Sequence, residues 1–303
     1  MRAVITGVTG LLGKHLVTRC PPATEIHGLS RGNWPAELES LCTMHEVDLL
    51  AHEATFDLLE LLAPDVVIHA AAEGRVDMVQ GKISEHEALN VEMGRKLAEF
   101  CTRRNIRFVF ISSNAVFGGS KVRYSDDSEF DPVNDYGVLK GKAEAAVLQA
   151  NPSALILRPI LMYGWPFSSG RQNPAVQWVK SLREGVPVSV VDDVWTQPLA
   201  AWDCADAVWS GAASHLNGGV NVSGGESSSL YEFALKTAAV FDLDTSLVLA
   251  ISSADLPQLA PRPINTEFDL IRLRNDLHVN PNSLQEGLEF LRASEPSIRS
   301  GNK

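Results

Sequence analysis

The chain has 303 residues, 45% of them hydrophobic, and a formal net charge of -11 at pH 7. A chain of this length can bury a large core, as one domain or two closely joined ones, without metal or disulfide crosslinks. Its acidic balance argues against sequence-independent binding to nucleic acid, which needs clustered Lys and Arg to neutralise phosphates. Any anionic ligand must therefore be held by local groups.

Cysteine spacing and hydropathy narrow the class of protein further. The cysteines are too far apart for a zinc site or a redox motif, so we expect reduced thiols and no metal: Cys20, Cys42, Cys101 and Cys204. The sequence opens directly into an apolar segment ending at Thr6, without the features of a signal peptide, and no apolar run approaches the roughly 20 residues that span a bilayer. We expect a cytoplasmic protein with no membrane segment.

Short apolar runs alternate with helical patterns in the first half of the chain. Strands are predicted over residues 3–6, 25–29, 66–69, 107–112 and 154–157. Helices are predicted over residues 12–19, 56–62, 85–103 and 136–149. This alternation predicts an α/β fold with a doubly wound parallel (Rossmann) sheet, whose ligands bind beyond the carboxyl ends of the strands.

The pattern loosens after Arg158 into a loop over residues 163–174 that is rich in Trp, Gly, Ser and Pro. Helices are then predicted over residues 176–184, 203–213, 230–241 and 284–293, and strands over 187–191 and 219–222. We expect a smaller C-terminal α/β substrate domain. The predicted boundaries are 1–160 plus about 199–223 for the Rossmann domain, and about 161–198 and 224–303 for the substrate domain.

Glycines three residues apart follow the first strand, at Gly7, Gly10 and Gly13. This spacing lets the backbone turn tightly and approach a diphosphate at a helix amino terminus. Val8 replaces the second glycine of the usual dinucleotide fingerprint, but the spacing matches the variant of short-chain dehydrogenases. The alternative is a purely structural turn. Cofactor contacts are predicted from Gly7, Thr9, Gly10, Leu11, Leu12 and Gly13.

The end of the second strand predicts which cofactor is bound. An NAD enzyme usually has Asp or Glu there, to hold the ribose 2′-hydroxyl. Here the chain has Ser30 and Arg31, which suit a 2′-phosphate and favour NADP(H) over NAD(H). The alternative is that Arg31 is simply solvated. We also expect Asp48 and Leu49 to contact adenine, and Ala70, Ala71 and Ala72 to form a smooth floor beside the cofactor.

Tyr136 and Lys140 are four residues apart, so on a helix they share one face. An ammonium beside a phenol favours phenolate, which predicts a pKa for Tyr136 below the usual value of about 10. Ser113 directly follows the strand predicted before this helix and could hydrogen-bond a carbonyl oxygen. Ser112 should face away, because side chains alternate along a strand. Carbonyl reduction is the chemistry that this combination supports.

With these motifs, the chain resembles an extended short-chain dehydrogenase/reductase, most closely the dTDP-4-dehydrorhamnose reductase-like branch that acts on nucleotide sugars. The resemblance covers nearly the whole chain and includes segments 65–72, 219–225, 231–234 and 262–265, and Asn90. It implies that Ser113 polarises the carbonyl, Tyr136 donates the proton, and Lys140 binds the nicotinamide ribose and depresses the tyrosine's pKa. It also implies NADPH as hydride donor and a homodimer.

Departures from the family concern the substrate. Reductases of this branch commonly have Asp-Tyr where this chain has Asn114-Ala115, and a Trp that is missing from the segment after Arg158. Substrate contacts are predicted from Asn114, from Arg171 in the long loop and from Arg262, which resembles a diphosphate-binding arginine. For both arginines the alternative is a solvated or structural side chain. The substrate is therefore expected to be a nucleotide-sugar-like small molecule that differs from 4-keto-rhamnose.

These residues support one leading function and two alternatives. The leading function is NADPH-dependent reduction of a keto group on a nucleotide-activated deoxysugar or a similar carbonyl compound. The first alternative is an NAD(P)-dependent nucleotide-sugar epimerase, because the run from Ser112 to Gly118 also resembles such enzymes. The second is a cofactor-binding regulatory subunit that resembles the β subunit of methionine adenosyltransferase.

Overall fold

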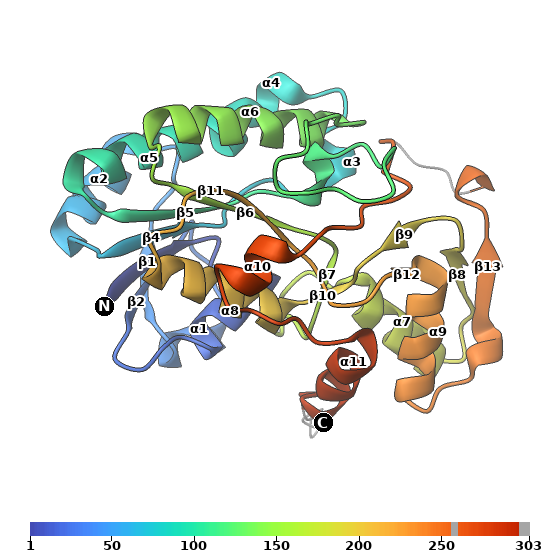
Figure 1. Cartoon of the computed structure of the whole chain (residues 1–303). Coiled ribbons are helices and arrows are strands. Elements are labelled where there is room, and N and C mark those ends of the chain that lie inside the picture. Colours follow the sequence, from blue (N-terminus) through green and yellow to red (C-terminus); the bar gives the residue numbers. More distant parts are fainter. Residues whose placement is uncertain (256–259, 297–303) are drawn as a thin grey trace.

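The computed structural model describes residues 1–255 and 260–296 (Figure 1). Its centre is a seven-stranded sheet in the order β11-β6-β5-β4-β1-β2-β3, in which every strand pair is parallel. The strands are β1 (Arg2–Thr6), β2 (Glu25–Ser30), β3 (Thr43–Glu46), β4 (Val66–His69), β5 (Arg107–Ile111), β6 (Leu155–Pro159) and β11 (Gly218–Val222). The predicted doubly wound parallel sheet is confirmed.

Helices cover both faces of this sheet (Figure 1). One face carries α2 (His52–Leu62), α5 (Met93–Arg104) and α6 (Asp135–Ala150), and the other carries α1 (Leu11–Thr18) and α8 (Ala201–Ala213). Alternate residues of a strand serve the two cores: Val4 packs with the α5 and α6 side, and Ile5 with the α1 and α8 side. Burial on both faces explains the nearly continuous apolar strands in the sequence.

The predicted helix over residues 85–103 is interrupted in the structure. It consists of α4 (Ile83–Glu87), a π-helical turn (Ala88–Glu92) and α5. Asn90 lies in the π turn and is buried. Its Oδ1 accepts a hydrogen bond from the Glu73 backbone N–H at 2.8 Å, and its Nδ2 donates to the Glu73 carbonyl at 3.1 Å. The irregular turn therefore fixes the segment that follows β4.

The second half of the chain adds a separate apolar cluster around Phe233 and Leu288, formed mainly by α7 (Pro174–Arg183), α9 (Leu230–Val240) and α11 (Leu284–Ala293). There β8 (Val188–Val191) pairs in parallel with β13 (Val248–Ile251), which was not predicted. Two-residue strands pair nearby: β7 (Met162–Tyr163) with β10 (Leu199–Ala200), and β9 (Trp195–Thr196) with β12 (Ser228–Ser229). The domain boundaries stay a prediction.

Local capping explains where two of these helices begin. The Ser229 side chain accepts from the Glu232 backbone N–H, and the Glu232 carboxylate accepts from the Ser229 N–H, so α9 starts with a capping box. Ser283 and Glu286 start α11 in the same way. Within residues 1–255 and 260–296, no helix is long and apolar enough to cross a membrane. The other short elements are α3 (Val76–Val79), α10 (Ile271–Asn275) and several 3-10 turns.

Candidate active site

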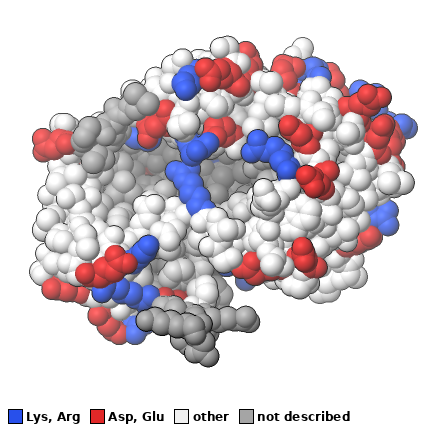
Figure 2. Space-filling model, turned by 180° about the vertical axis from the view of Figure 1, so that it is seen from behind, with Lys and Arg blue, Asp and Glu red and all other residues white. Residues whose placement is uncertain are grey.

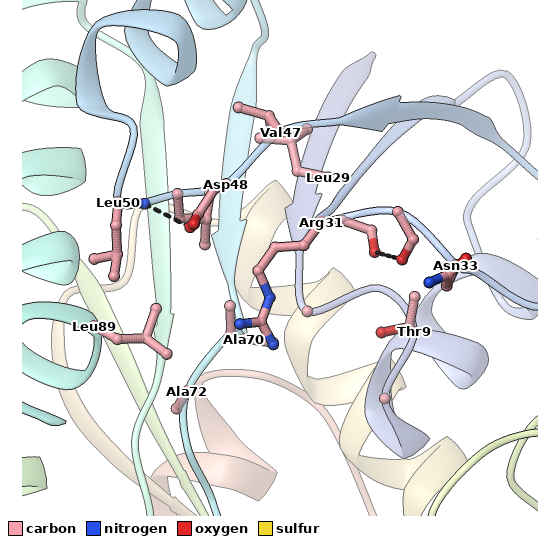
Figure 3. A pocket seen from close by; sticks show the side chains of 16 residues that line it. Thr9, Leu29, Arg31, Asn33, Val47, Asp48, Leu50, Ala70, Ala72 and Leu89 are labelled. Carbon is pink, nitrogen blue, oxygen red and sulfur yellow. Dashed lines mark hydrogen bonds between the residues drawn. The ribbon is translucent and has the colours of Figure 1, made fainter. Parts of the chain in front are cut away.

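A cavity of about 370 Å³ opens at the carboxyl ends of β1, β2 and β4 (Figure 3). Predicted cofactor residues that line it are Gly7, Thr9, Gly10, Ser30, Arg31, Asp48, Leu49, Ala70, Ala71 and Ala72. Leu11, Leu12 and Gly13 are not among its lining residues; Leu12 and Gly13 are buried within α1. Lining residues that we did not predict are Leu29, Gly32, Asn33, Val47, Leu50 and Leu89. Except for Leu89, on the π turn, these adjoin or lie close to predicted positions.

The glycines of the first turn are required by close backbone contacts. Gly7 has a φ of +72°, and a Cβ there would lie 2.7 Å from the carbonyl carbon and oxygen of Ala70. A Cβ on Gly13 would lie 2.2 Å from the Val8 carbonyl oxygen, so this glycine permits tight packing of turn and helix. Gly10 is exposed and precedes α1. The turn thus keeps the helix amino terminus accessible from the cavity.

Arg31 reaches over the cavity from the end of β2 (Figure 3). The chain turns sharply just after it, because Gly32 and Asn33 have φ angles of +96° and +53°. Ser30 Oγ donates to the Gly32 carbonyl at 3.3 Å and braces this turn. Asn33 and Thr9 also line the cavity (Figure 3). A guanidinium, an amide and two hydroxyls therefore border one cavity, as an anionic group would require.

A buried hydrogen-bond chain holds the alanine floor in place. Thr6 Oγ1 accepts from the Ala71 backbone N–H at 3.2 Å, so its own proton is available for His69 Nδ1 at 2.7 Å. Burial lowers the pKa of His69 to about 3, with a smaller contribution from the charge of Lys140. His69 is therefore neutral at physiological pH, which is the state that can accept this hydrogen bond. His69 therefore has a structural role in holding the end of β1 and the alanine floor together.

Ser113, Tyr136 and Lys140 come together at the carboxyl end of β5. Lys140 is buried and donates from Nζ to the Ile111 carbonyl at 2.9 Å. The same Nζ lies 5.9 Å from the centre of the Tyr136 ring. Ser113 Oγ accepts from the Ala115 N–H at 3.2 Å and donates to Asn114 Oδ1 at 3.4 Å, and the Ser113 hydroxyl acts to lower the pKa of Tyr136. The three residues predicted as catalytic thus form one cluster, although they do not line the cavity above.

The expected low pKa of Tyr136 is wrong for this structure. Burial raises the pKa of Tyr136 to about 12, and the opposing effect of the Ser113 hydrogen bond is smaller. Burial also lowers the pKa of Lys140 to about 8, although the Glu144 charge acts against it. The sequence spacing could indicate that Lys140 lies near the phenol, but not that both groups are desolvated. The phenol is therefore protonated at neutral pH.

The predicted substrate residues lie in different surroundings. Asn114 follows Ser113 and is half-buried in a 3-10 turn (Asn114–Val116). Arg171 is exposed in the loop before α7. Arg262 forms an ion pair with Asp77 of α3 at 2.9 Å and donates to the Ala260 carbonyl at 2.8 Å. Figure 2 shows Lys and Arg side chains at the border of a hollow on the face opposite to that of Figure 1.

Asn134 connects the segment of Arg262 to the helix of Tyr136. Its Oδ1 accepts from the Gly137 N–H at 2.9 Å and caps α6. Its Nδ2 donates to the Pro261 carbonyl at 2.9 Å. The segment that carries Arg262 therefore passes over the amino terminus of α6, two residues before Tyr136.

Comparison with known proteins agrees with this arrangement. The RmlD substrate binding domain family matches residues 1–294. A Haloferax volcanii protein named "probable low-salt glycan biosynthesis reductase" is 29% identical over 97% of this chain and 98% of its own length. The dTDP-4-dehydrorhamnose reductase of Aggregatibacter actinomycetemcomitans is 28% identical over 96% and 98%. Methionine adenosyltransferase 2 subunit beta of Rattus norvegicus is 29% identical over 90% and 81%.

Solved structures show the same fold. The dTDP-4-dehydrorhamnose reductase of Bacillus anthracis, in complex with NADP, superposes with a TM-score of 0.87 at 25% identity, over 97% of this chain and 99% of that one. The UDP-glucose 4-epimerase of Thermotoga maritima gives 0.83 at 18% identity, over 96% and 97%, and shows the fold alone. With a family match over residues 1–294, the chain belongs to the RmlD substrate binding domain family, within the extended short-chain dehydrogenases/reductases, a class of NAD(P)-dependent oxidoreductases.

Proposed function

We propose that the protein reduces a keto group on a nucleotide-activated deoxysugar to an alcohol, with NADPH as reductant. The observation that carries this proposal is the cluster of Ser113, Tyr136 and Lys140 at the end of β5. Ser113 would hydrogen-bond the carbonyl oxygen, and Tyr136 would give that oxygen its proton. Bound NADPH supplies the hydride that the carbonyl carbon takes up. Lys140 would then stabilise the phenolate that remains.

The phenol of Tyr136 is protonated in the free protein, because burial raises its pKa to about 12. This is the form that can donate a proton to a carbonyl oxygen, as the proposed reduction requires. An epimerase would first use the phenolate as a base, so the stoichiometry of NADPH consumption separates the two functions.

The cavity at β1, β2 and β4 is our proposed site for NADPH. Gly7 and Gly10 would let the backbone approach the diphosphate, and Arg31 with Ser30 would bind the 2′-phosphate. The Bacillus anthracis relative in complex with NADP supports this choice. NADH lacks the 2′-phosphate and should bind more weakly. Asp48 and Leu49 would contact the adenine.

The substrate would lie beyond Ser113, between Asn114 and the segment of Arg262. Arg262 can bind a diphosphate through two parallel hydrogen bonds, and Arg171 could approach from its exposed loop. Asn114 and Ala115 stand where related reductases commonly have Asp and Tyr, so we expect a sugar that differs from 4-keto-rhamnose. We further propose a homodimer, as the family resemblance implies, and a cytoplasmic location; light scattering tests the oligomeric state.

The test is to mix the protein with NADPH and a panel of 4-keto deoxysugar nucleotides. Stoichiometric loss of reduced-nicotinamide absorbance supports the reductase, and product without such loss supports the epimerase. Tyr136→Phe should lower kcat at least 100-fold, as expected when a general acid is removed, and leave NADPH affinity within twofold. Tyr231→Phe, in α9, is the matched control and should keep full activity. Unchanged turnover in Tyr136→Phe would contradict the proposed proton transfer.

A regulatory subunit is the second candidate, because a β subunit of methionine adenosyltransferase is 29% identical to this chain over 90% of its length. This function predicts NADPH binding without turnover of any keto sugar. It also predicts that the protein co-migrates with a methionine adenosyltransferase in gel filtration. Turnover that depends on Tyr136 would argue for the enzyme.

A further inference from the structure

Glu144 extends the row of functional side chains on α6. Tyr136, Lys140 and Glu144 follow each other at intervals of four residues, so they occupy one face of the helix. Only 1% of the Glu144 surface is exposed. A buried carboxylate is unfavourable unless it is paired and hydrogen-bonded, so its partners indicate its purpose.

The partners of Glu144 come from β6 and from the residue that follows β5. Arg158 of β6 donates from Nε to both carboxylate oxygens at 3.0 Å and from Nη2 to Oε2 at 2.8 Å. Ser112, immediately after β5, donates from Oγ to Oε1 at 2.5 Å. Arg158 is also buried and donates from Nη1 to the Asp126 carbonyl at 2.8 Å. Both ions are therefore fully engaged by neighbouring groups.

These contacts fasten α6 to the end of β5 at two successive residues. Lys140 donates to the Ile111 carbonyl, and Glu144 accepts from the Ser112 hydroxyl. The next residue is Ser113, whose hydroxyl acts on the pKa of the Tyr136 phenol. Sliding or rotation of α6 would break the bonds at Ile111 and Ser112 together. The same movement would separate Ser113 from the phenol.

We propose that Glu144 is a positioning residue: it fixes α6 against β5 and places a carboxylate one helical turn from Lys140. Its catalytic consequence rests on the proposed reductase function. The carboxylate does not touch the carbonyl or the phenol in this arrangement. It acts through Ser112 on the position of Ser113, and through its charge on Lys140.

The ionisable groups around this pair leave a clear pH window. Lys140 faces Tyr136 and Glu144 on α6 and His69 on β4; Glu144 faces Arg158 on β6, with Asp126 behind it. The pKa values of His69, Asp126 and Tyr136 are about 3, 6 and 12. Neither His69, Asp126 nor Tyr136 therefore changes charge between pH 7.5 and about 10. Lys140, with a pKa of about 8, does.

The free energy of unfolding, measured in urea from pH 7 to 10, reports the protonation of Lys140 without any assay of activity. The folded protein releases the Lys140 proton near pH 8 and the unfolded chain only near 10.4, so this group makes the fold more stable as pH rises through that window. Its contribution to the unfolding equilibrium should be about tenfold per pH unit, obtained by subtracting the profile of Lys140→Met. This subtraction also removes the opposing effect of the buried thiols of Cys101 and Cys204.

In Glu144→Gln, the rise of stability with pH, which we call the window, should begin at least half a pH unit lower, because Lys140 has lost its anionic neighbour. Asp206→Asn is the matched control, since it removes a two-point bond with Arg19 at the surface, and its window should stay in place. A window that does not move in Glu144→Gln would overturn the electrostatic role. Ser112→Ala retains the Glu144–Arg158 pair and should leave the window unchanged.

Steady-state kinetics test the mechanical role. Glu144→Gln should lower kcat ten- to 100-fold, which is the effect of a small displacement of reacting groups, and leave KM for NADPH within twofold. It should also move the alkaline limb of the pH profile to lower pH. Ser112→Ala should lower kcat at least threefold without moving that limb; it also keeps the test valid if Glu144→Gln does not fold. Unchanged kcat in Ser112→Ala would overturn the fastening role. Wild-type protein that binds NADPH but turns over no keto sugar would instead count against the proposed function.

Discussion

The close contact between Gly7 and Ala70 can be measured with a pair of glycine substitutions. Gly7 and Gly81 have nearly the same left-handed backbone, with φ of +72° and +75°. A Cβ at Gly7 would lie 2.7 Å from the backbone of Ala70, whereas a Cβ at Gly81 would meet nothing within 4 Å. Alanine at either site therefore incurs the same cost of left-handed backbone, about 1–2 kcal/mol. Only Gly7→Ala must also push two backbone segments apart.

The magnitude follows from this difference. Overpacking in a well-packed region costs about 1–3 kcal/mol, so Gly7→Ala should destabilise the protein by about that much more than Gly81→Ala. Gly7→Ala should also weaken NADPH binding at least tenfold, because the first turn and the alanine floor can no longer approach each other. Urea denaturation gives the free energies of unfolding, and fluorescence titration gives the affinities. Equal losses of stability in the two variants would refute the steric argument and leave backbone conformation as the only cost.

Further predictions concern the cofactor, acid stability and helix capping. Arg31→Ala should weaken NADPH binding about ten- to 100-fold, because a charge-assisted hydrogen bond is lost, and NADH binding less than threefold. Isothermal titration calorimetry with both cofactors measures the two affinities. Equal losses would contradict the assignment of Arg31 to the 2′-phosphate. His69→Asn keeps an acceptor for Thr6 but no titrating ring. The unfolded histidine binds a proton near pH 6.5, but the folded state does not. The unfolding free energy of wild type should therefore fall by about 3 kcal/mol more than that of this variant between pH 7.5 and 4.5, as measured by urea denaturation. Ser229→Ala removes the capping box of α9 and should cost about 1 kcal/mol of unfolding free energy without changing NADPH affinity.

The central sheet could be predicted from sequence because its strands are buried on both faces. Val66 to His69 forms an unbroken apolar run apart from the last residue, and it was predicted with the bounds that the structure has. β13 escaped prediction because only Val248 of its four residues is fully buried. Its partner β8 lies far away in the sequence. A short strand that is held by a distant partner leaves little periodicity of its own.

Residues of the candidate site could be predicted where residue type and sequence spacing both indicate a function. Properties that depend on contacts between distant segments could not. Ser113, Tyr136 and Lys140 were brought together as their positions on a strand and a helix suggest. The π turn at Asn90 was not predicted, because it depends on the backbone of Glu73 after another strand. The raised pKa of Tyr136 was not predicted either, since desolvation depends on what packs around a side chain. The pairing of Arg262 with Asp77 likewise joins segments that lie far apart in the sequence.

The two hydrogen bonds of Asn134 have a consequence for biosynthesis. One side chain caps α6 and also holds the Pro261 carbonyl, which lies 127 residues further along the chain. Because a ribosome makes the chain from its amino terminus, the glycine turn and the helix of Tyr136 emerge well before Pro261 exists. The start of that helix gains its last neighbour only near the end of translation. A chain truncated before Pro261 should therefore keep the cap on α6 and lose the second partner of the Asn134 side chain.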